Sequence, residues 1–168
     1  MRKREQIEGW RSRGYLPHYE GETAVQFITY RLADSLPRSI IERMKIELGR
    51  GAITEIEYYR RFDKYLDEGR GESHLKKPAV AEMVEENLLQ FDGEKYELHS
   101  WVVMPNHVHL LLAPLEGVSL ARIMHSMKSY TSHQANKILN RTGHFWSKEY
   151  FDRYIRNAEH YERTIAYI

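Results

Sequence analysis

Two histidines that lie one residue apart are the side chains in this sequence best suited to chemistry. His107 and His109 flank Val108, and on a β-strand side chains two residues apart point to the same face. Val108, Leu110 and Leu112 would then point the other way, toward a core. Two imidazoles on one strand face can ligate a metal ion. Because two ligands are too few for a stable site, we expect a third polar ligand from a neighbouring element.

The elements around this pair predict how the histidine strand is held. Residues 96–103 and 107–113 are strand-like and are joined by a short Pro-Asn connection, which predicts an antiparallel pair. The other predicted elements are a strand over 23–31, helices over 37–48, 53–66, 78–91 and 119–140, a pattern break at 143–146, a strand over 150–156 and a helix over 158–168. This order predicts an α+β fold, a ferredoxin-like antiparallel sheet with helices packed mainly on one face.

The length of 168 residues is enough for one domain with its own core, and hardly for two. Residues 1–20 mix basic and aromatic residues with Gly and Pro, so we interpret them as an irregular N-terminal arm. Residues 21–168 are predicted to form a single domain, with a helical insertion at about 52–72.

The composition excludes several classes of protein. The chain has no cysteine, which rules out disulfides and thiolate metal sites and agrees with a cytoplasmic setting. The charged first residues show no signal peptide, and no run of about 18 apolar residues occurs, so we expect no membrane association. Basic residues are concentrated toward both ends around an acidic middle, a pattern that suggests a polyanionic partner. His-Glu-x-x-His, Gly-rich phosphate-loop and Gly-x-Ser-x-Gly motifs are absent from the sequence.

Several blocks, in the same order, resemble one family of DNA-processing enzymes. The block Trp-Val-Val-Met-Pro-Asn-His-Val-His-Leu-Leu at 101–111 resembles the signature of the HUH-type single-tyrosine transposases, and more narrowly that of the REP-associated tyrosine transposases. The similarity continues in Met127–Thr131, His144–Trp146, Tyr150–Asp152, Ile155–Asn157 and Tyr167–Ile168. Residues 21–168 therefore resemble a single HUH transposase-like catalytic domain.

This resemblance implies cleavage and rejoining of single-stranded DNA near hairpins. His107, His109 and a third polar side chain would hold a divalent metal ion, Mg²⁺ or Mn²⁺, at the scissile phosphate. A tyrosine would attack phosphorus and form a 5′-phosphotyrosine intermediate, which stores the bond energy needed for rejoining. The implied partner is single-stranded or hairpin DNA, and the REP-associated branch implies a monomer, with a homodimer as the alternative.

The resemblance assigns the nucleophile to Tyr167, the tyrosine of the family's Tyr-Ile-x-x-Asn pattern. On the last helix, Tyr167 points about 140° away from the apolar stripe, at about 100° per residue. The rival nucleophile is Tyr130, because Tyr130 and Gln134 have the Tyr-x-x-x-Gln spacing of related transposases. Tyr130 is disfavoured because it precedes the blocks at 144–146 and 150–152, which the family's nucleophile follows.

The sequence departs from the family at the third metal ligand. In the family this ligand lies four residues past the tyrosine, whereas the sequence ends at Ile168, one residue past it. The domain therefore looks cut short, and the alternative function is a catalytically impaired or domesticated protein that binds hairpin or single-stranded DNA. A metal-dependent hydrolase of small molecules is a third hypothesis. The candidates for contacts to the DNA backbone are Lys128, Arg153, Arg156 and Arg163.

Overall fold

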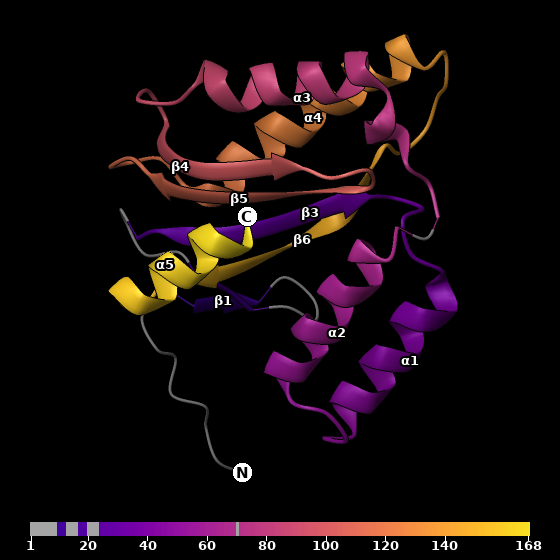
Figure 1. Ribbon diagram of the computed structural model, residues 1–168, viewed down its shortest axis with the longest axis vertical. Coiled ribbons are helices and arrows are strands. Elements are labelled where there is room, and N and C mark those ends of the chain that lie inside the picture. Colours follow the sequence, from indigo (N-terminus) through magenta and orange to yellow (C-terminus); the bar gives the residue numbers. More distant parts are fainter. Residues whose placement is uncertain (1–9, 13–16, 20–23, 70) are drawn as a thin grey trace.

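The centre of the molecule is a four-stranded antiparallel sheet (Figure 1). The computed structural model describes residues 10–12, 17–19, 24–69 and 71–168. The strands are β3 (Gln26–Leu32), β4 (Tyr96–Val103), β5 (His107–Pro114) and β6 (Trp146–Tyr154), in the spatial order β4-β5-β3-β6. Every pair of neighbours is antiparallel, with β5 and β3 in the middle. The predicted α+β, ferredoxin-like fold is confirmed.

One face of the sheet is covered by α3 (Pro78–Gln90) and α4 (Leu120–Ile138). The alternate residues Val108, Leu110 and Leu112 of β5 point to this face and are fully buried. They pack with Ile28 of β3 and with apolar side chains of both helices. Burial of such aliphatic side chains contributes about 1.5–3 kcal/mol each, so this layer is the main core of the domain.

The opposite face carries the histidines and is covered by other helices. α5 (Ala158–Tyr167) packs there against a small cluster that includes Phe27, Leu111 and Ile155. α1 (Arg38–Gly49) and α2 (Glu55–Asp67) form a pair with its own core, which contacts the sheet through Phe151. A short 3₁₀ turn, η1 (His74–Lys76), connects α2 to α3.

Helix starts agree with the sequence signals. Thr54, Ser119 and Asn157 cap α2, α4 and α5, each accepting a hydrogen bond from the backbone N–H three residues later. Pro78 lies in the first turn of α3, where its missing N–H costs nothing.

Two segments differ from the sequence-based expectation. Trp146, which was expected to lie in a break, is the first residue of β6, because its indole is buried beneath α4 and against Tyr30. Within the arm predicted to be irregular, β1 (Trp10–Ser12) and β2 (Pro17–Tyr19) form an antiparallel pair. The rest of the predicted arm, residues 1–9, 13–16 and 20, lies outside the described residues.

The described helices do not suggest a membrane-spanning segment. None of those in the described part of the chain combines the length and the apolar character that a span requires.

A buried hydrogen bond between α4 and β6 generates a stability prediction. The Trp146 indole N–H donates to Thr131 Oγ1 at 2.8 Å, and the Thr131 hydroxyl donates to the Met127 carbonyl at 2.7 Å. Thr131→Val keeps the volume but leaves a buried indole N–H unpaired, so we expect the free energy of unfolding in urea to fall by about 1–3 kcal/mol.

The matched control for this prediction is the same substitution in a Trp146→Phe chain, which has no indole N–H to leave unpaired. There, Thr131→Val should cost clearly less. Equal costs in the two backgrounds would mean that the hydrogen bond contributes nothing.

Candidate active site

The two histidines lie side by side on the central strand β5 and are both buried. Their side chains are 0 % and 3 % exposed for His107 and His109, and their Nε2 atoms are 2.9 Å apart. The Asp67 carboxylate, at the last residue of α2, approaches them with its Oδ1 3.6 Å from His107 Nε2. The possible ligand atoms of these three residues lie within 4.8 Å of one another. The structure thus places a third polar group at the histidine pair, from an element distant in sequence.

Neighbouring side chains fix the orientation of both imidazoles. The Asn106 amide N–H₂ donates to the Leu66 carbonyl at 3.1 Å, which turns its Oδ1 toward His107 Nδ1 at 2.7 Å. Since an amide oxygen only accepts, His107 carries its proton on Nδ1 and presents a lone pair on Nε2. His109 Nδ1 lies 2.8 Å from Thr29 Oγ1, which can either donate or accept. At the 2.9 Å contact His109 Nε2 then donates to His107 Nε2, and a bound metal ion would require the other His109 tautomer, in which Nδ1 donates to Thr29 Oγ1 and both Nε2 lone pairs are free.

Burial keeps the two imidazoles neutral. It lowers the pKa of His107 to about 4. Burial, together with the neighbouring His107, lowers the pKa of His109 to about 3. At neutral pH both side chains are therefore in the form that ligates metals.

Tyr167, at the end of α5, packs against His109 of the histidine pair. Its ring meets the His109 ring at 5.3 Å with an interplanar angle of 60°, and the Phe27 ring at 6.0 Å. Its hydroxyl lies near the Asp67 carboxylate and interacts with it, and the side chain remains 49 % exposed. The tyrosine thus contacts His109, lies near the carboxylate and is half-exposed to solvent.

The electrostatic environment of the Tyr167 hydroxyl disfavours the phenolate. Burial, the Asp63 and Asp67 charges and the hydrogen bond to Asp67 raise the pKa of Tyr167, while Arg153 opposes them. Burial also raises the pKa of Asp67, and the hydrogen bond from Tyr167 lowers it. A proton acceptor is therefore needed if Tyr167 is to act as a nucleophile.

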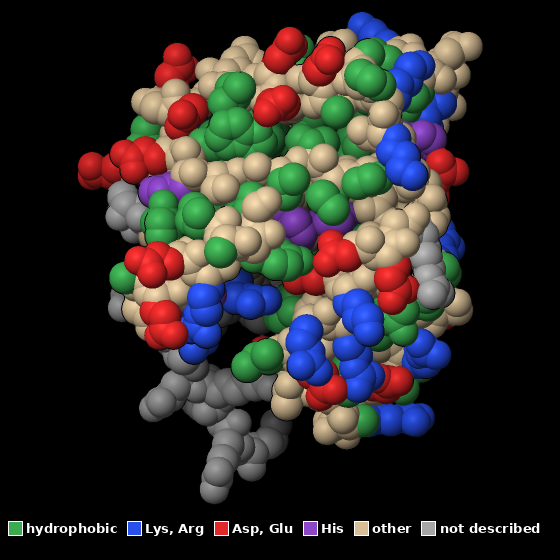
Figure 2. Space-filling model, viewed as in Figure 1, with side chains coloured by type: hydrophobic (Ala, Val, Ile, Leu, Met, Phe, Trp, Pro, Cys, Tyr) green, Lys and Arg blue, Asp and Glu red, His purple; other side chains and the backbone are tan. Residues whose placement is uncertain are grey.

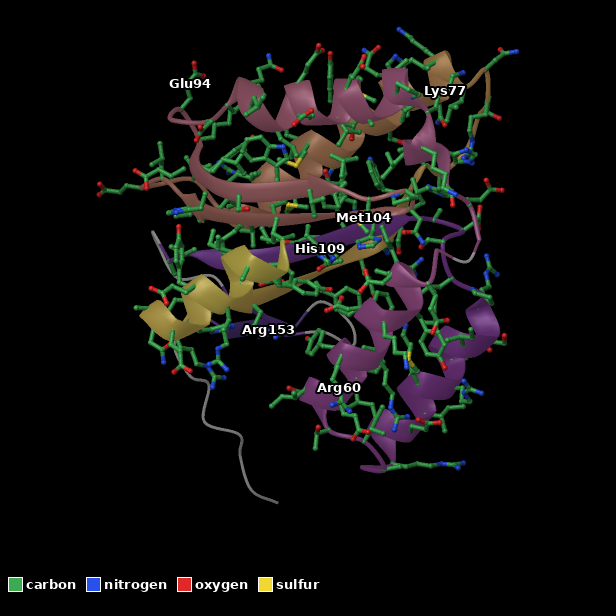
Figure 3. All side chains as sticks on the ribbon, viewed as in Figure 1. Arg60, Lys77, Glu94, Met104, His109 and Arg153 are labelled. Atoms are coloured by element: carbon green, nitrogen blue, oxygen red, sulfur yellow. The ribbon has the colours of Figure 1, made fainter. Side chains whose placement is uncertain are left out.

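α5 is held on the sheet by polar and apolar contacts. The strand register shifts between Leu98 and Ser100, and the intervening His99 bonds through Nδ1 to the Tyr161 hydroxyl of α5 at 2.8 Å. Tyr161 and Ile168 also pack on the apolar cluster of this sheet face. These contacts orient the end of α5 toward His109 (Figure 3).

Three of the predicted DNA contacts gather near α5. Arg153 lies on β6 with its guanidinium 5.6 Å from the centre of the Tyr59 ring (Figure 3). Arg153, Arg163 and Arg156 all act on His160, whose pKa is lowered first by burial and then by these three positive charges. Arg163 is 3.5 Å from Glu159 in an exposed ion pair. A concentration of positive charge therefore lies beside the histidine face.

The other two predicted residues lie elsewhere. Lys128 and Tyr130 are on α4, which covers the opposite face of the sheet. The Lys128 ammonium donates to the Lys148 carbonyl at 2.9 Å, and burial lowers its pKa to about 8. Tyr130 is 48 % exposed. The structure brings neither residue to the histidine pair.

Two imidazole nitrogens and one carboxylate form a donor set that suits a divalent first-row metal ion. The buried, neutral histidines have lone pairs to share, and the Asp67 carboxylate, 45 % exposed, has room to adjust its position. The residues present therefore fit the metal that the sequence led us to expect.

Comparison with known proteins identifies the family. A family model described as "Transposase IS200 like" matches residues 72–168. The chain belongs to this family. The segment that matches the IS200-like transposases contains His107, His109 and Tyr167, and it confirms the resemblance seen in the sequence. No curated protein matches the chain.

One solved structure supports the fold. The structure described as a REP-associated tyrosine transposase bound to a REP hairpin is 17 % identical, with a TM-score of 0.58, and covers 90 % of this chain and 67 % of that chain. A putative transposase from Deinococcus radiodurans is 14 % identical over 94 % of this chain and 92 % of that chain. Its TM-score is only 0.38, so no argument rests on it.

Sequence reasoning missed three residues of this IS200-like transposase site. Asp67 lies in the predicted helical insertion and before residue 72, where the family match begins, so no motif marked it. Asn106 stands within the quoted histidine block, and its place beside His107 was the only signal for its orienting role. Thr29 becomes a candidate only when the register pairs it with His109.

The carboxylate one turn before Asp67 generates a pH prediction. Burial raises the pKa of Asp63 to about 7, although Arg153 opposes this shift. A raised carboxylate pKa means that the folded state holds the proton more tightly than the unfolded state, so stability falls as the pH rises from about 4 through about 7.

Asp63→Asn should remove this loss in metal-free protein. Its melting temperature relative to wild type should therefore rise between pH 4 and pH 8, as measured by circular dichroism in EDTA. Glu94→Gln, which removes the same charge from an exposed turn, is the control. If both variants show the same pH profile, Asp63 does not titrate in this range.

Proposed function

We propose that this IS200-like transposase is a metal-dependent enzyme that cleaves and rejoins single-stranded DNA near hairpins through a 5′-phosphotyrosine intermediate. The observation that carries the proposal is the position of Tyr167, whose ring packs on the His109 ring at 5.3 Å, beside the group formed by Asp67 and the two buried histidines. A tyrosine nucleophile, a proton acceptor and a metal donor set thus meet at one point.

The metal would be held by His107, His109 and Asp67. The chemistry that a divalent ion supplies at such a site is polarisation and orientation of the scissile phosphate. Mixed nitrogen and oxygen donors favour Mn²⁺ over Mg²⁺, since Mg²⁺ prefers oxygen ligands alone.

Tyr167 would act as the nucleophile. Its phenolic oxygen forms a bond to phosphorus while the bond from phosphorus to the 3′-oxygen breaks. The phenolic proton passes to the nearby Asp67 carboxylate, and the leaving 3′-oxygen takes up a proton from water. One phosphodiester bond is exchanged for another, so the reverse reaction rejoins a strand without ATP.

The DNA substrate is supported by charge and by fold. Arg153, Arg156 and Arg163 concentrate positive charge beside the site, where backbone phosphates would lie. The relative with the same fold was solved with a REP hairpin, which supports a hairpin-flanked substrate here. We propose that the protein acts as a monomer, because one chain supplies all four site residues.

One prediction of this proposal concerns the nucleophile. Tyr167→Phe should abolish the covalent adduct formed when the protein is incubated with single-stranded hairpin DNA and Mn²⁺, because no phenolic oxygen remains to attack. The adduct is measured as a shifted band in a denaturing gel.

Tyr130→Phe is the matched control, because that ring is equally exposed and lies away from the histidines. An adduct that persists in Tyr167→Phe and disappears in Tyr130→Phe would reverse the assignment. DNA binding without product with any divalent ion would instead support the DNA-binding protein that does not cut.

The second prediction concerns the third ligand. Asp67→Ala should weaken Mn²⁺ binding by about 10- to 100-fold in calorimetry, because it removes the only carboxylate of the donor set. Glu68→Gln, which removes the same charge one residue later, should leave the affinity within about twofold. Equal affinities for wild type and Asp67→Ala would exclude Asp67 as a ligand.

A further inference from the structure

α2 carries a second positively charged surface at the candidate site. Arg60 and Lys64 are exposed on this helix, and in the described part of the chain neither side chain forms an ion pair or hydrogen bond. The next residue, Arg61, behaves differently, since it bonds to Glu47 at 3.0 Å and to Glu57 at 2.7 Å. Arg61 is therefore held in ion pairs within the α1–α2 pair, whereas Arg60 and Lys64 face solvent.

The two solvent-facing cations lie on the same face of α2 as the site carboxylate. At about 100° per residue, Arg60, Lys64 and Asp67 fall within about 60° of one another. With a rise of about 1.5 Å per residue, Lys64 and Arg60 lie about 5 and 10 Å along the helix axis from Asp67. The stripe continues to Ile56, which is 78 % exposed. Cations followed by an exposed apolar side chain suit a strand that has both phosphates and unpaired bases.

This surface lies across the site from the arginines near α5. Figure 2 shows Lys and Arg side chains gathered on either side of the hollow between α5 and α2, below the central histidines and separated from them by acidic and hydrophobic side chains. Arg153 and Arg60 are labelled on these two sides in Figure 3. The carboxylates Asp63 and Asp67 lie between them, where a metal ion rather than a phosphate would neutralise their charge. α2 also precedes residue 72, where the family match begins.

We propose that the face of α2 formed by Ile56, Arg60 and Lys64 binds the single-stranded DNA that flanks the scissile phosphate. Arg60 and Lys64 contact two backbone phosphates, and Ile56 contacts a base beyond them. A stacked strand advances about 3.4 Å per nucleotide, so about 10 Å of helix places these contacts within about three nucleotides of the cleavage point. The inference deepens the proposed function and rests on it for the location of the scissile phosphate.

The test compares DNA affinity at different salt concentrations for Arg60→Gln/Lys64→Gln. All measurements use the Tyr167→Phe chain in EDTA with a fluorescent single-stranded oligonucleotide, so that no strand is cut. Loss of two phosphate contacts should reduce the slope of log affinity against log salt by about 1.4. The ratio of the parent chain's DNA affinity to the variant's DNA affinity should therefore fall about sevenfold between about 50 and 200 mM salt.

The matched control is Arg122→Gln/Lys137→Gln, which removes two exposed charges from α4 on the opposite side of the sheet. It should keep the parent slope. Equal slopes for both double variants, or a parent chain that binds no DNA, would overturn the proposal. Thermal unfolding of each variant checks that it is folded, and both pairs of residues are exposed, so no loss is expected.

A methylphosphonate scan makes the test positional. Replacing a phosphate that Arg60 or Lys64 contacts should weaken binding of the parent chain but not of the α2 double variant, at positions within about three nucleotides of the cleavage point. If no phosphate position shows this difference between the parent chain and the variant, the proposal is also overturned. Adduct formation by the wild-type chain is scored separately, so a failure of the cleavage chemistry is distinguished from a failure of this surface.

Discussion

Everything at the site depends on a central strand that is buried on both faces. All eight residues of β5 are buried, so each side of the strand must be covered by another element. The aliphatic side is covered by α3 and α4, as in any two-layer domain. The polar side presents imidazoles, whose nitrogens need partners when they are removed from water. Asn106 is the partner of His107, Thr29 is the partner of His109, and the two rings also contact each other. These contacts fix the orientation of both rings.

The fold could be read from the sequence because its signals are local. Periodicity gave the strands at 96–103 and 107–113, and the short connection between them gave their pairing. Trp146 was misjudged because nearby glycine and histidine resemble a loop, whereas its burial under α4 is decided by residues far away. Local pattern is a weak guide where tertiary packing decides.

The site was only partly predictable, for a related reason. The histidine pair is a short motif, and Tyr167 follows from the family blocks and from its position off the apolar stripe. Asp67 is 40 residues from His107 in the sequence, and it reaches the pair only because Asn106 binds the last turn of α2 through the Leu66 carbonyl. Such a contact has no signature in composition or spacing, so only the folded chain reveals it.

The bond between Asn106 and Leu66 has an evolutionary consequence. It fastens α2 to the turn before β5, while the α1–α2 pair keeps a core of its own that meets the sheet through Phe151 of β6. An appendage joined in this way can diverge, lengthen or be replaced without disturbing the sheet. Since Asp67 and the cations of α2 belong to this pair of helices, relatives that share the sheet could exchange both the proposed metal ligand and the proposed DNA-binding surface in one step. Differences in DNA target between members of this transposase family would then arise in the part of the chain before residue 72, outside the segment that matches the family model.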